Sequence, residues 1–263
     1  MAVPAAHEVW IGTDRGRIHA KRWSGALMAA PPFVLFHDSL GCVALWRDFP
    51  ARLVMATGHD VIAYDRLGFG QSDPHPEQLD FNFIRDEARF ALPALRAQFG
   101  FDQCIAFGHS VGGGMAIECA AAFPETCVAL ITESAQTFVE RRTLDGIHAA
   151  QHDFAQADQR ARLRKYHGDK TDWVLSAWFD TWLAPAFADW NLDRALAQVH
   201  CPTLAIHGEH DEYGSVAHPQ RIAAVAQAPV SVSILARCGH VPHREAESTV
   251  LGLVEELLSS IRD

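Results

Sequence analysis

The sequence predicts an α/β protein with a mostly parallel central sheet, helices on both faces of that sheet and a helical cap. The first observation is a series of short, wholly apolar runs, which are typical of strands buried on both faces of a parallel sheet. The second is that segments with helical spacing separate these runs, as in successive βαβ units. The third is a long polar stretch, residues 137–199, where helical spacing continues without a buried strand.

The elements can be assigned in order along the chain. Residues 7–13 and 17–23 alternate between apolar and polar side chains around Asp14-Arg15-Gly16, a pattern that predicts a hairpin. The apolar runs predict buried strands at residues 32–36, 60–64, 104–107, 127–132, 203–206 and 230–235. Helical spacing predicts helices at residues 44–56, 83–99, 111–123, 219–226 and 245–261. Gly100 and Pro124 follow two of these helices and are typical of helix ends.

The polar stretch divides the chain into two parts. We expect residues 1–136 and 200–263 to form the core and residues 137–199 to form a helical cap over the strand ends. This segment contains four of the seven tryptophans, Trp173, Trp178, Trp182 and Trp190. Such rings either pack cap helices against each other and the core, or line an apolar substrate pocket. We take Trp178 and Trp182 as the candidates for the pocket.

Composition narrows the classes of function. The chain has 263 residues, is 49% hydrophobic and carries a formal net charge of -10. A core of this size needs no disulfide or metal, and an acidic chain without a Lys/Arg cluster is not expected to bind nucleic acid or an anionic membrane. The cysteines are scattered without a CxxC pair, and residues 1–7 show no signal peptide. We therefore expect a cytoplasmic protein with no membrane-spanning segment.

One five-residue stretch carries most of the chemistry. Gly108-His109-Ser110-Val111-Gly112 follows an apolar run and precedes a run of small residues. This is G-x-S-x-G at a strand-to-helix junction, the context of a nucleophile elbow. The sharp turn exposes the serine hydroxyl above the sheet, at the positive end of the following helix. Ser110 is therefore the candidate nucleophile.

A serine hydroxyl needs a base to accept its proton and a third group to orient that base. His240 comes directly after the predicted strand at 230–235, in Cys238-Gly239-His240, and is the candidate base. His243, three residues later, is the alternative. We expect the base at the carboxyl end of the sheet, where ligands bind in parallel α/β proteins.

Two strand ends offer the orienting acid. Residues 207–212 follow one predicted strand and contain Glu209, Asp211 and Glu212. Glu133 ends another strand and is a competitor. The spacing from the strand favours Asp211, and we expect Glu133 to face the substrate pocket.

The order Ser110, Asp211, His240 is the chain order of the α/β-hydrolases. The chain resembles this superfamily over nearly its whole length, and the resemblance therefore implies an α/β-hydrolase fold. Four motifs carry the resemblance: His37-Asp38-Ser39-Leu40-Gly41, Asp65-Arg66-Leu67-Gly68-Phe69-Gly70-Gln71-Ser72, Gly108-His109-Ser110-Val111-Gly112-Gly113, and Gly208-Glu209-His210-Asp211 with Gly239-His240.

The resemblance implies an oxyanion hole made of two backbone amides. One belongs to Val111, the residue after the nucleophile, and the other to Ser39, with Leu40 as the alternative donor and a candidate for the pocket wall. The sequence departs from the family pattern at Asp38, where the family has glycine. Aspartate tolerates unusual turn conformations, but a carboxylate next to an oxyanion is unfavourable unless it points away.

These residues predict a serine hydrolase that cleaves an ester-like bond of a small apolar or aromatic substrate through an acyl-enzyme. Two related reactions stay open. Ser39-Leu40-Gly41 with Leu45-Trp46 resembles the corresponding loop of oxoadipate enol-lactonases, and hydrolases of carbon–carbon bonds share the same triad. A member of a different class, a small-ligand receptor that retains the triad, is the other alternative.

We expect no metal or cofactor and no macromolecular ligand. His207, His210 and Asp211 have a spacing that a metal could use, as do His240 and His243, but the triad already explains Asp211 and His240. Neither the phosphate-binding G-x-x-x-x-G-K-[ST] motif nor a G-x-G-x-x-G motif after the first strand is present. The expected partner is a small-molecule substrate.

Overall fold

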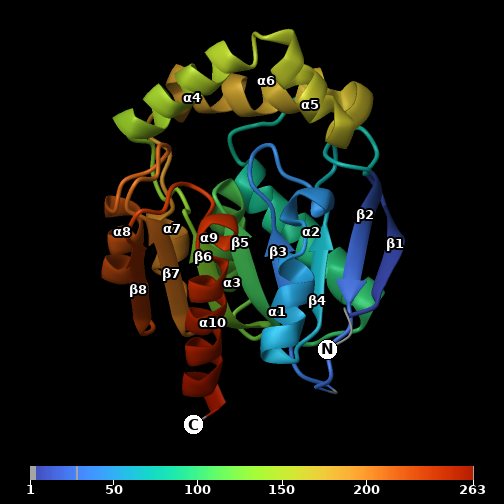
Figure 1. The fold of residues 1–263 in the computed structure, drawn as a ribbon, viewed down its shortest axis with the longest axis vertical. Helices are drawn as coiled ribbons and strands as arrows, with labels where there is room; N and C mark the ends of the chain where they lie inside the picture. Colours follow the sequence, from blue (N-terminus) through green and yellow to red (C-terminus); the bar gives the residue numbers. More distant parts are fainter. Residues whose placement is uncertain (1–3, 28, 263) are drawn as a thin grey trace.

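The computed structural model describes residues 4–27 and 29–262, which form an eight-stranded sheet with helices on both faces (Figure 1). The strands lie in the order β1-β2-β4-β3-β5-β6-β7-β8. Their bounds are β1 (Ala6–Thr13), β2 (Gly16–Trp23), β3 (Phe33–Phe36), β4 (Val61–Tyr64), β5 (Cys104–His109), β6 (Cys127–Glu133), β7 (Thr203–Gly208) and β8 (Val230–Leu235). The α-helices of the core are α1 (Phe49–Thr57), α2 (Phe83–Phe99), α3 (Val111–Ala122), α7 (Asp193–Leu196), α8 (Ala217–Val225), α9 (Pro242–Glu245) and α10 (Glu247–Arg262).

The sheet is mostly parallel, as predicted. β1 pairs with β2 and β2 with β4 in antiparallel fashion, whereas β4, β3, β5, β6, β7 and β8 pair in parallel. The register places Phe36 opposite Gly108 and His109 opposite Glu133. The carboxyl ends of β3, β5 and β6 therefore meet at one edge of the sheet, where the predicted site residues follow them.

The two faces of the sheet bury two separate apolar layers. In β3, Phe33 and Leu35 join the layer that contains Phe49 of α1 and Val250 of α10. The alternate residues of β3 join the layer of α2 and α3. Side chains that alternate in direction but are all apolar are what a strand covered on both faces requires, and the α/β prediction is confirmed.

The segment after β6 forms a helical layer above the carboxyl ends of the strands (Figure 1). It contains α4 (Arg141–Asp153), α5 (Ala157–His167) and α6 (Thr171–Trp182). The bridge between Phe138 and Asn191 brings the two ends of the segment together. After α6, the chain returns to the core, where Leu196 packs into the layer of α2 and α3.

One predicted helix is divided in the structure. The predicted helix at 44–56 is a 3-10 turn, η1 (Val43–Trp46), followed by α1. Arg47 separates them with φ of 52°, and Pro50 at the start of α1 has no N–H to continue a helix. The predicted helix at 245–261 is present as the single helix α10, and the short helix α9 precedes it.

Two further properties concern the helices and the cysteines. No helix within residues 4–27 and 29–262 is long and apolar enough to span a bilayer. All six cysteines lie in this part of the chain and have free thiols.

Candidate functional site

Ser110 lies at a sharp turn between β5 and α3. Its backbone has φ of 56° and ψ of -126°, which a residue with a side chain adopts only under strain. The turn requires close backbone contact: a Cβ atom on Gly108 would lie 2.1 Å from the carbonyl oxygen of Gly112, and one on Gly112 would lie 2.1 Å from that of Phe36. Only glycine fits these two positions, which is the physical reason for the G-x-S-x-G pattern.

His240 and Asp211 form a hydrogen-bonded pair next to this turn. The Nδ1 atom of His240 lies 2.8 Å and 2.9 Å from the two carboxylate oxygens of Asp211. Asp211 is 1% exposed and also accepts hydrogen bonds from the backbone amides of Tyr213 (2.8 Å) and Gly214 (3.2 Å). Burial acts to raise the pKa of Asp211, but the hydrogen bond and charge of His240 outweigh it and lower that pKa. Asp211 is therefore ionised and fixed in orientation.

A cavity of about 140 Å³ opens between the sheet edge and the helical layer. Ser110 and His240 both line it, together with Asp38, Ser39, Leu40, His109, Gln136, Thr143, Ile147, Trp178, Trp182, Tyr213 and Val241. No lysine or arginine is present among these lining residues. The wall is thus mainly apolar and aromatic, with a few polar groups close to Ser110.

Gln136 is a site residue that the sequence analysis missed. The hydroxyl of Ser110 donates a hydrogen bond to Gln136 Oε1 at 3.2 Å. The side chain is buried, and the turn at Ser134, with φ of 50°, precedes it. The only sequence feature that could have identified Gln136 is its position shortly after a strand end. Glu133 has the same feature, so it does not distinguish the two residues.

The backbone amides expected for an oxyanion hole differ in whether they already donate a hydrogen bond within the protein. The amide of Leu40 donates to Asp38 Oδ1 at 2.8 Å, whereas that of Ser39 has no acceptor among residues 4–27 and 29–262. Val111 is the first residue of α3, and the first amides of a helix have no intrahelical acceptor. Ser39 and Val111 therefore both have an N–H available to a ligand.

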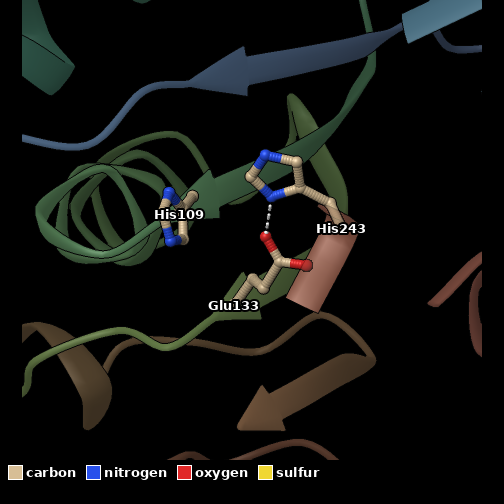
Figure 2. A group of neighbouring side chains, drawn as sticks. All are labelled: His109, Glu133 and His243. Atoms are coloured by element: carbon tan, nitrogen blue, oxygen red, sulfur yellow. Dashed lines mark hydrogen bonds and ion pairs between the residues drawn. The ribbon is translucent and has the colours of Figure 1, made fainter. Parts of the chain in front are cut away.

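Glu133 does not line the cavity, contrary to our expectation. It is fully buried, and its Oε2 atom accepts a hydrogen bond from Nδ1 of His243 at 2.5 Å (Figure 2). Glu133 follows the alternation of Ala129 and Ile131 in β6, whose side chains face the layer of α1 and α10. This direction leads away from the cavity. Burial lowers the pKa of His243, although Glu133 opposes this effect, so the imidazole is neutral.

Glu133 and His243 also lie close to His109 (Figure 2). One potential ligand atom of each lies within 4.8 Å of the others. However, Glu133 and His243 share a direct hydrogen bond, and both ring nitrogens of His109 face other oxygen atoms. The cluster is therefore joined by a hydrogen-bonded pair, while the buried atoms Glu133 Oε1 and His243 Nε2 have no hydrogen-bond partner among the described residues.

The four tryptophans of residues 137–199 divide between the two roles considered above. Trp178 and Trp182 line the cavity. Trp173 covers Gly68, where a Cβ atom would lie 2.3 Å from its ring. The ring of Trp190 packs 5.5 Å from that of Trp182, between centroids.

The profile of the α/β hydrolase fold family matches residues 31–167, which include the Ser110 turn and the loop that contains Ser39. The chain belongs to the α/β-hydrolase family. This membership agrees with the resemblance found in the four sequence motifs.

Two proteins named as hydrolases and one named as an acyltransferase are similar to this chain in sequence. The 2-hydroxymuconate semialdehyde hydrolase of Pseudomonas sp. (strain CF600) is 26% identical over 255 residues, which cover 87% of each chain. The serine hydrolase BPHL of Mus musculus is 28% identical over 159 residues, 57% of this chain and 53% of that protein. The human 1-acylglycerol-3-phosphate O-acyltransferase ABHD5 is 28% identical over 133 residues, but this match spans only 37% of its length.

Solved structures with the same fold cover almost the whole chain. A bacterial membrane phospholipase A superposes with a TM-score of 0.79 at 19% identity and covers 99% of this chain and 87% of its own. Proline iminopeptidase of Mycobacterium smegmatis gives a TM-score of 0.72 at 20% identity, with 97% and 98% covered. These similarities establish the fold of the hydrolase core.

Proposed function

We propose that this family member is a serine hydrolase that cleaves an ester-like bond of a small, uncharged, apolar or aromatic substrate. The observation that carries the proposal is the arrangement at the cavity: Ser110 at a strained turn, beside a histidine that a buried, ionised Asp211 orients. A serine, a base and an orienting acid are the three groups that nucleophilic acyl transfer requires.

In the proposed reaction, Ser110 Oγ attacks the carbonyl carbon of the substrate and His240 accepts the hydroxyl proton. The carbonyl oxygen becomes an oxyanion, to which the free amides of Ser39 and Val111 donate hydrogen bonds. The bond to the leaving alcohol then breaks, and the imidazolium of His240 returns the proton to that oxygen. A water molecule, deprotonated by His240, attacks the acyl-enzyme; the bond to Ser110 Oγ then breaks, the acid is released, and the imidazolium of His240 returns the proton to Ser110 Oγ.

Gln136 takes part in the first of these steps. A serine hydroxyl has one proton to donate, and in the free protein this proton is directed to Gln136 Oε1. Substrate binding has to redirect it to His240. Hydrogen bonds of catalytic groups are often formed only in the complex with substrate.

The cavity wall supports the choice of substrate class. Leu40, Ile147, Trp178 and Trp182 supply apolar surface, and the volume of about 140 Å³ suits a small acyl or alcohol group. Asp38 also lines the cavity, and although burial acts to raise its pKa, the hydrogen bond and charge of His109 lower it. No lysine or arginine of the described wall is available to pair with an acidic substrate.

A second candidate is hydrolysis of a lactone or of a carbon–carbon bond next to a carbonyl group. It is favoured by the relative that matches over 87% of both chains, which is named as a 2-hydroxymuconate semialdehyde hydrolase. The same serine, base and oxyanion donors would serve such a reaction. The absence of lysine and arginine from the described cavity wall argues against a substrate with a free carboxylate.

The test is covalent labelling combined with a substrate panel. A fluorophosphonate probe is expected to label Ser110, and Ser110→Ala is expected to lower kcat by about 10⁴–10⁶ with folding intact. Neutral aryl and alkyl esters are expected to be turned over faster than lactones, diketones or acidic esters. Labelling at a different serine would refute the assignment of Ser110 as the nucleophile. Binding of panel compounds without any turnover would favour a small-ligand receptor.

A further inference from the structure

His109, the residue before the nucleophile, has a hydrogen-bond acceptor at each of its ring nitrogens. Nδ1 lies 3.3 Å from Asp38 Oδ2, and Nε2 lies 2.8 Å from the backbone carbonyl oxygen of His240. The His109 side chain is 2% exposed. A neutral imidazole has one N–H, whereas the imidazolium has two. Both contacts are hydrogen bonds only when the ring is protonated.

The charges around His109 favour this protonated form. Asp38 approaches from the loop after β3, and Glu133 approaches from the end of β6. The neutral ring of His243 lies 5.1 Å away, between centroids, with its Nδ1 hydrogen bonded to Glu133 (Figure 2). The ring of His240 lies at 5.0 Å. Burial acts to lower the pKa of His109, but the hydrogen bond and charge of Asp38, followed by the charge of Glu133, outweigh it and raise that pKa.

The two partners of His109 belong to the two loops on which the proposed reaction depends. Asp38 directly precedes Ser39, whose free amide is a proposed oxyanion donor, and it also accepts the hydrogen bond from the amide of Leu40. His240 is the proposed base. One buried ring, adjacent in sequence to Ser110, therefore contacts both loops.

We propose that protonated His109 is a positioning residue that holds the Ser39 loop and the His240 loop in register with Ser110. The inference rests on the proposed function of this site. It also explains the departure from the family pattern at Asp38, because a glycine there could not pair with a charged ring. The carboxylate points to His109, which keeps its charge paired and directed away from the oxyanion.

The proposal has a consequence at alkaline pH. When the ring loses a proton, one nitrogen presents a lone pair to an oxygen atom, and either the Asp38 or the His240 contact is lost. The two loops are then less well aligned, and kcat falls on the alkaline side. A displacement of reacting groups by about 1 Å is sufficient to cost on the order of 100-fold in rate.

The first test compares pH profiles of kcat and KM for the best ester substrate in the wild type, His109→Gln, Asp38→Asn and the control His200→Gln, which alters an exposed histidine. His109→Gln is expected to lower kcat by about 10- to 100-fold, with KM changed less than about threefold and no alkaline decline. Asp38→Asn preserves volume and is expected to move the alkaline decline to lower pH by about one unit. His200→Gln is expected to match the wild type. An unchanged alkaline decline in both site variants would overturn the proposal.

The second test does not depend on activity. Nitrogen NMR of the histidine rings, recorded on Ser110→Ala, reports the protonation of each nitrogen of His109, with His109→Gln used for assignment. Both nitrogens are expected to carry protons at pH 7, and Asp38→Asn is expected to lower the pH at which one is lost. A ring that is neutral at pH 7 would overturn the proposal. Failure of the proposed function would instead appear as absent ester turnover and absent labelling of Ser110, with this titration unaffected.

Discussion

At the scale of single residues, two of the histidine–carboxylate pairs at the site have different surroundings. His240 pairs with Asp211 and lines the cavity, whereas His243 pairs with Glu133 and is sealed under the layer that contains Trp46. Both pairs have the geometry of a base held by an acid. Access to the cavity distinguishes them, because His240 lines the same cavity as Ser110 and His243 does not line it, so the proposed reaction assigns the proton of Ser110 to His240.

This difference predicts unequal effects of two conservative substitutions. Asp211→Asn leaves His240 in the wrong tautomer, and we expect kcat to fall by about 10⁴, as in the serine-protease example of that change. Glu133→Gln still accepts the hydrogen bond of His243, and we expect a loss of at most about tenfold. Both variants conserve volume and are expected to fold.

The measurement is a pH–rate profile at saturating substrate for each variant, which separates a lost acid from a shifted titration. Circular dichroism serves as the control for folding. A crippled Glu133→Gln with a nearly normal Asp211→Asn would reverse the assignment of the acid.

At the scale of elements, the helical layer of α4–α6 is attached to the core at defined points. His167 at the end of α5 accepts a hydrogen bond from the amide of Gly70 at 2.9 Å and donates one to the carbonyl of Leu40 at 2.9 Å. Lys170 donates to the carbonyl of Gly70 at 2.9 Å. These contacts connect the layer both to the turn at residues 65–72 and to the loop that contains Ser39.

The cavity-lining face of α6 is expected to determine which substrates are accepted. Trp178 and Trp182 line the cavity, so Trp178→Ala and Trp182→Ala enlarge it and change relative kcat/KM among esters of different size. Trp190→Ala, outside the cavity, is the matched control. A methylene-sized change in an apolar pocket alters selectivity by about 10- to 200-fold. Identical selectivity in all three variants would mean that these rings serve only in packing.

The attachment through His167 requires a neutral ring, since Nδ1 accepts a hydrogen bond. Burial lowers its pKa, although its bond to Leu40 and the charges of Asp65 and Asp38 oppose this. A folded pKa below the unfolded value of about 6.5 gives stability that is present above that pH and is lost as pH falls. His167→Gln retains a donor and an acceptor but cannot take up a proton.

We therefore expect His167→Gln to lose less stability than the wild type between pH 6.5 and 5. The difference is at most about 1.4 kcal/mol per pH unit in the free energy of unfolding. Urea unfolding at pH 7, 6 and 5 measures it, with exposed His200→Gln as the control. Parallel losses in all three proteins would exclude this role of His167.

At the scale of the whole molecule, the sequence analysis predicted the sheet, the Ser110 turn and the separate helical segment, because each depends on local pattern. It did not predict the place of Glu133. A strand that is apolar on both faces contains no signal for which face its last side chain takes. Gln136 and the contacts of His109 join parts of the chain that are distant in sequence, and only the folded sheet edge brings them together.

Buried neutral histidines are a property of the entire core. Burial lowers the pKa of five of them, and the members of this group are His37 (to about 3), His167, His207, His218 (to about 4) and His243. The unfolded chain binds protons at these positions from about pH 6.5 downward. The free energy of unfolding is therefore expected to decrease as pH falls from 7 to 5.

The expected slope corresponds to an uptake of up to five protons on unfolding, each worth about 1.4 kcal/mol per pH unit at full occupancy. Urea titrations at several pH values give this slope directly. His109 contributes with the opposite sign, since its raised pKa gives stability that is lost as pH rises. A free energy of unfolding that is flat from pH 7 to 5 would contradict the buried neutral state of the five rings.

The backbone conformation of Ser110 lowers the stability of the fold, whereas its side chain is required for the proposed reaction. A non-glycine residue at φ of 56° and ψ of -126° costs roughly 1–3 kcal/mol, and glycine would relieve that cost without disturbing the turn. Glycine at this position would therefore give a more stable chain that lacks the hydroxyl. The conformational cost borne at Ser110 is thus accounted for by the reaction proposed for its hydroxyl.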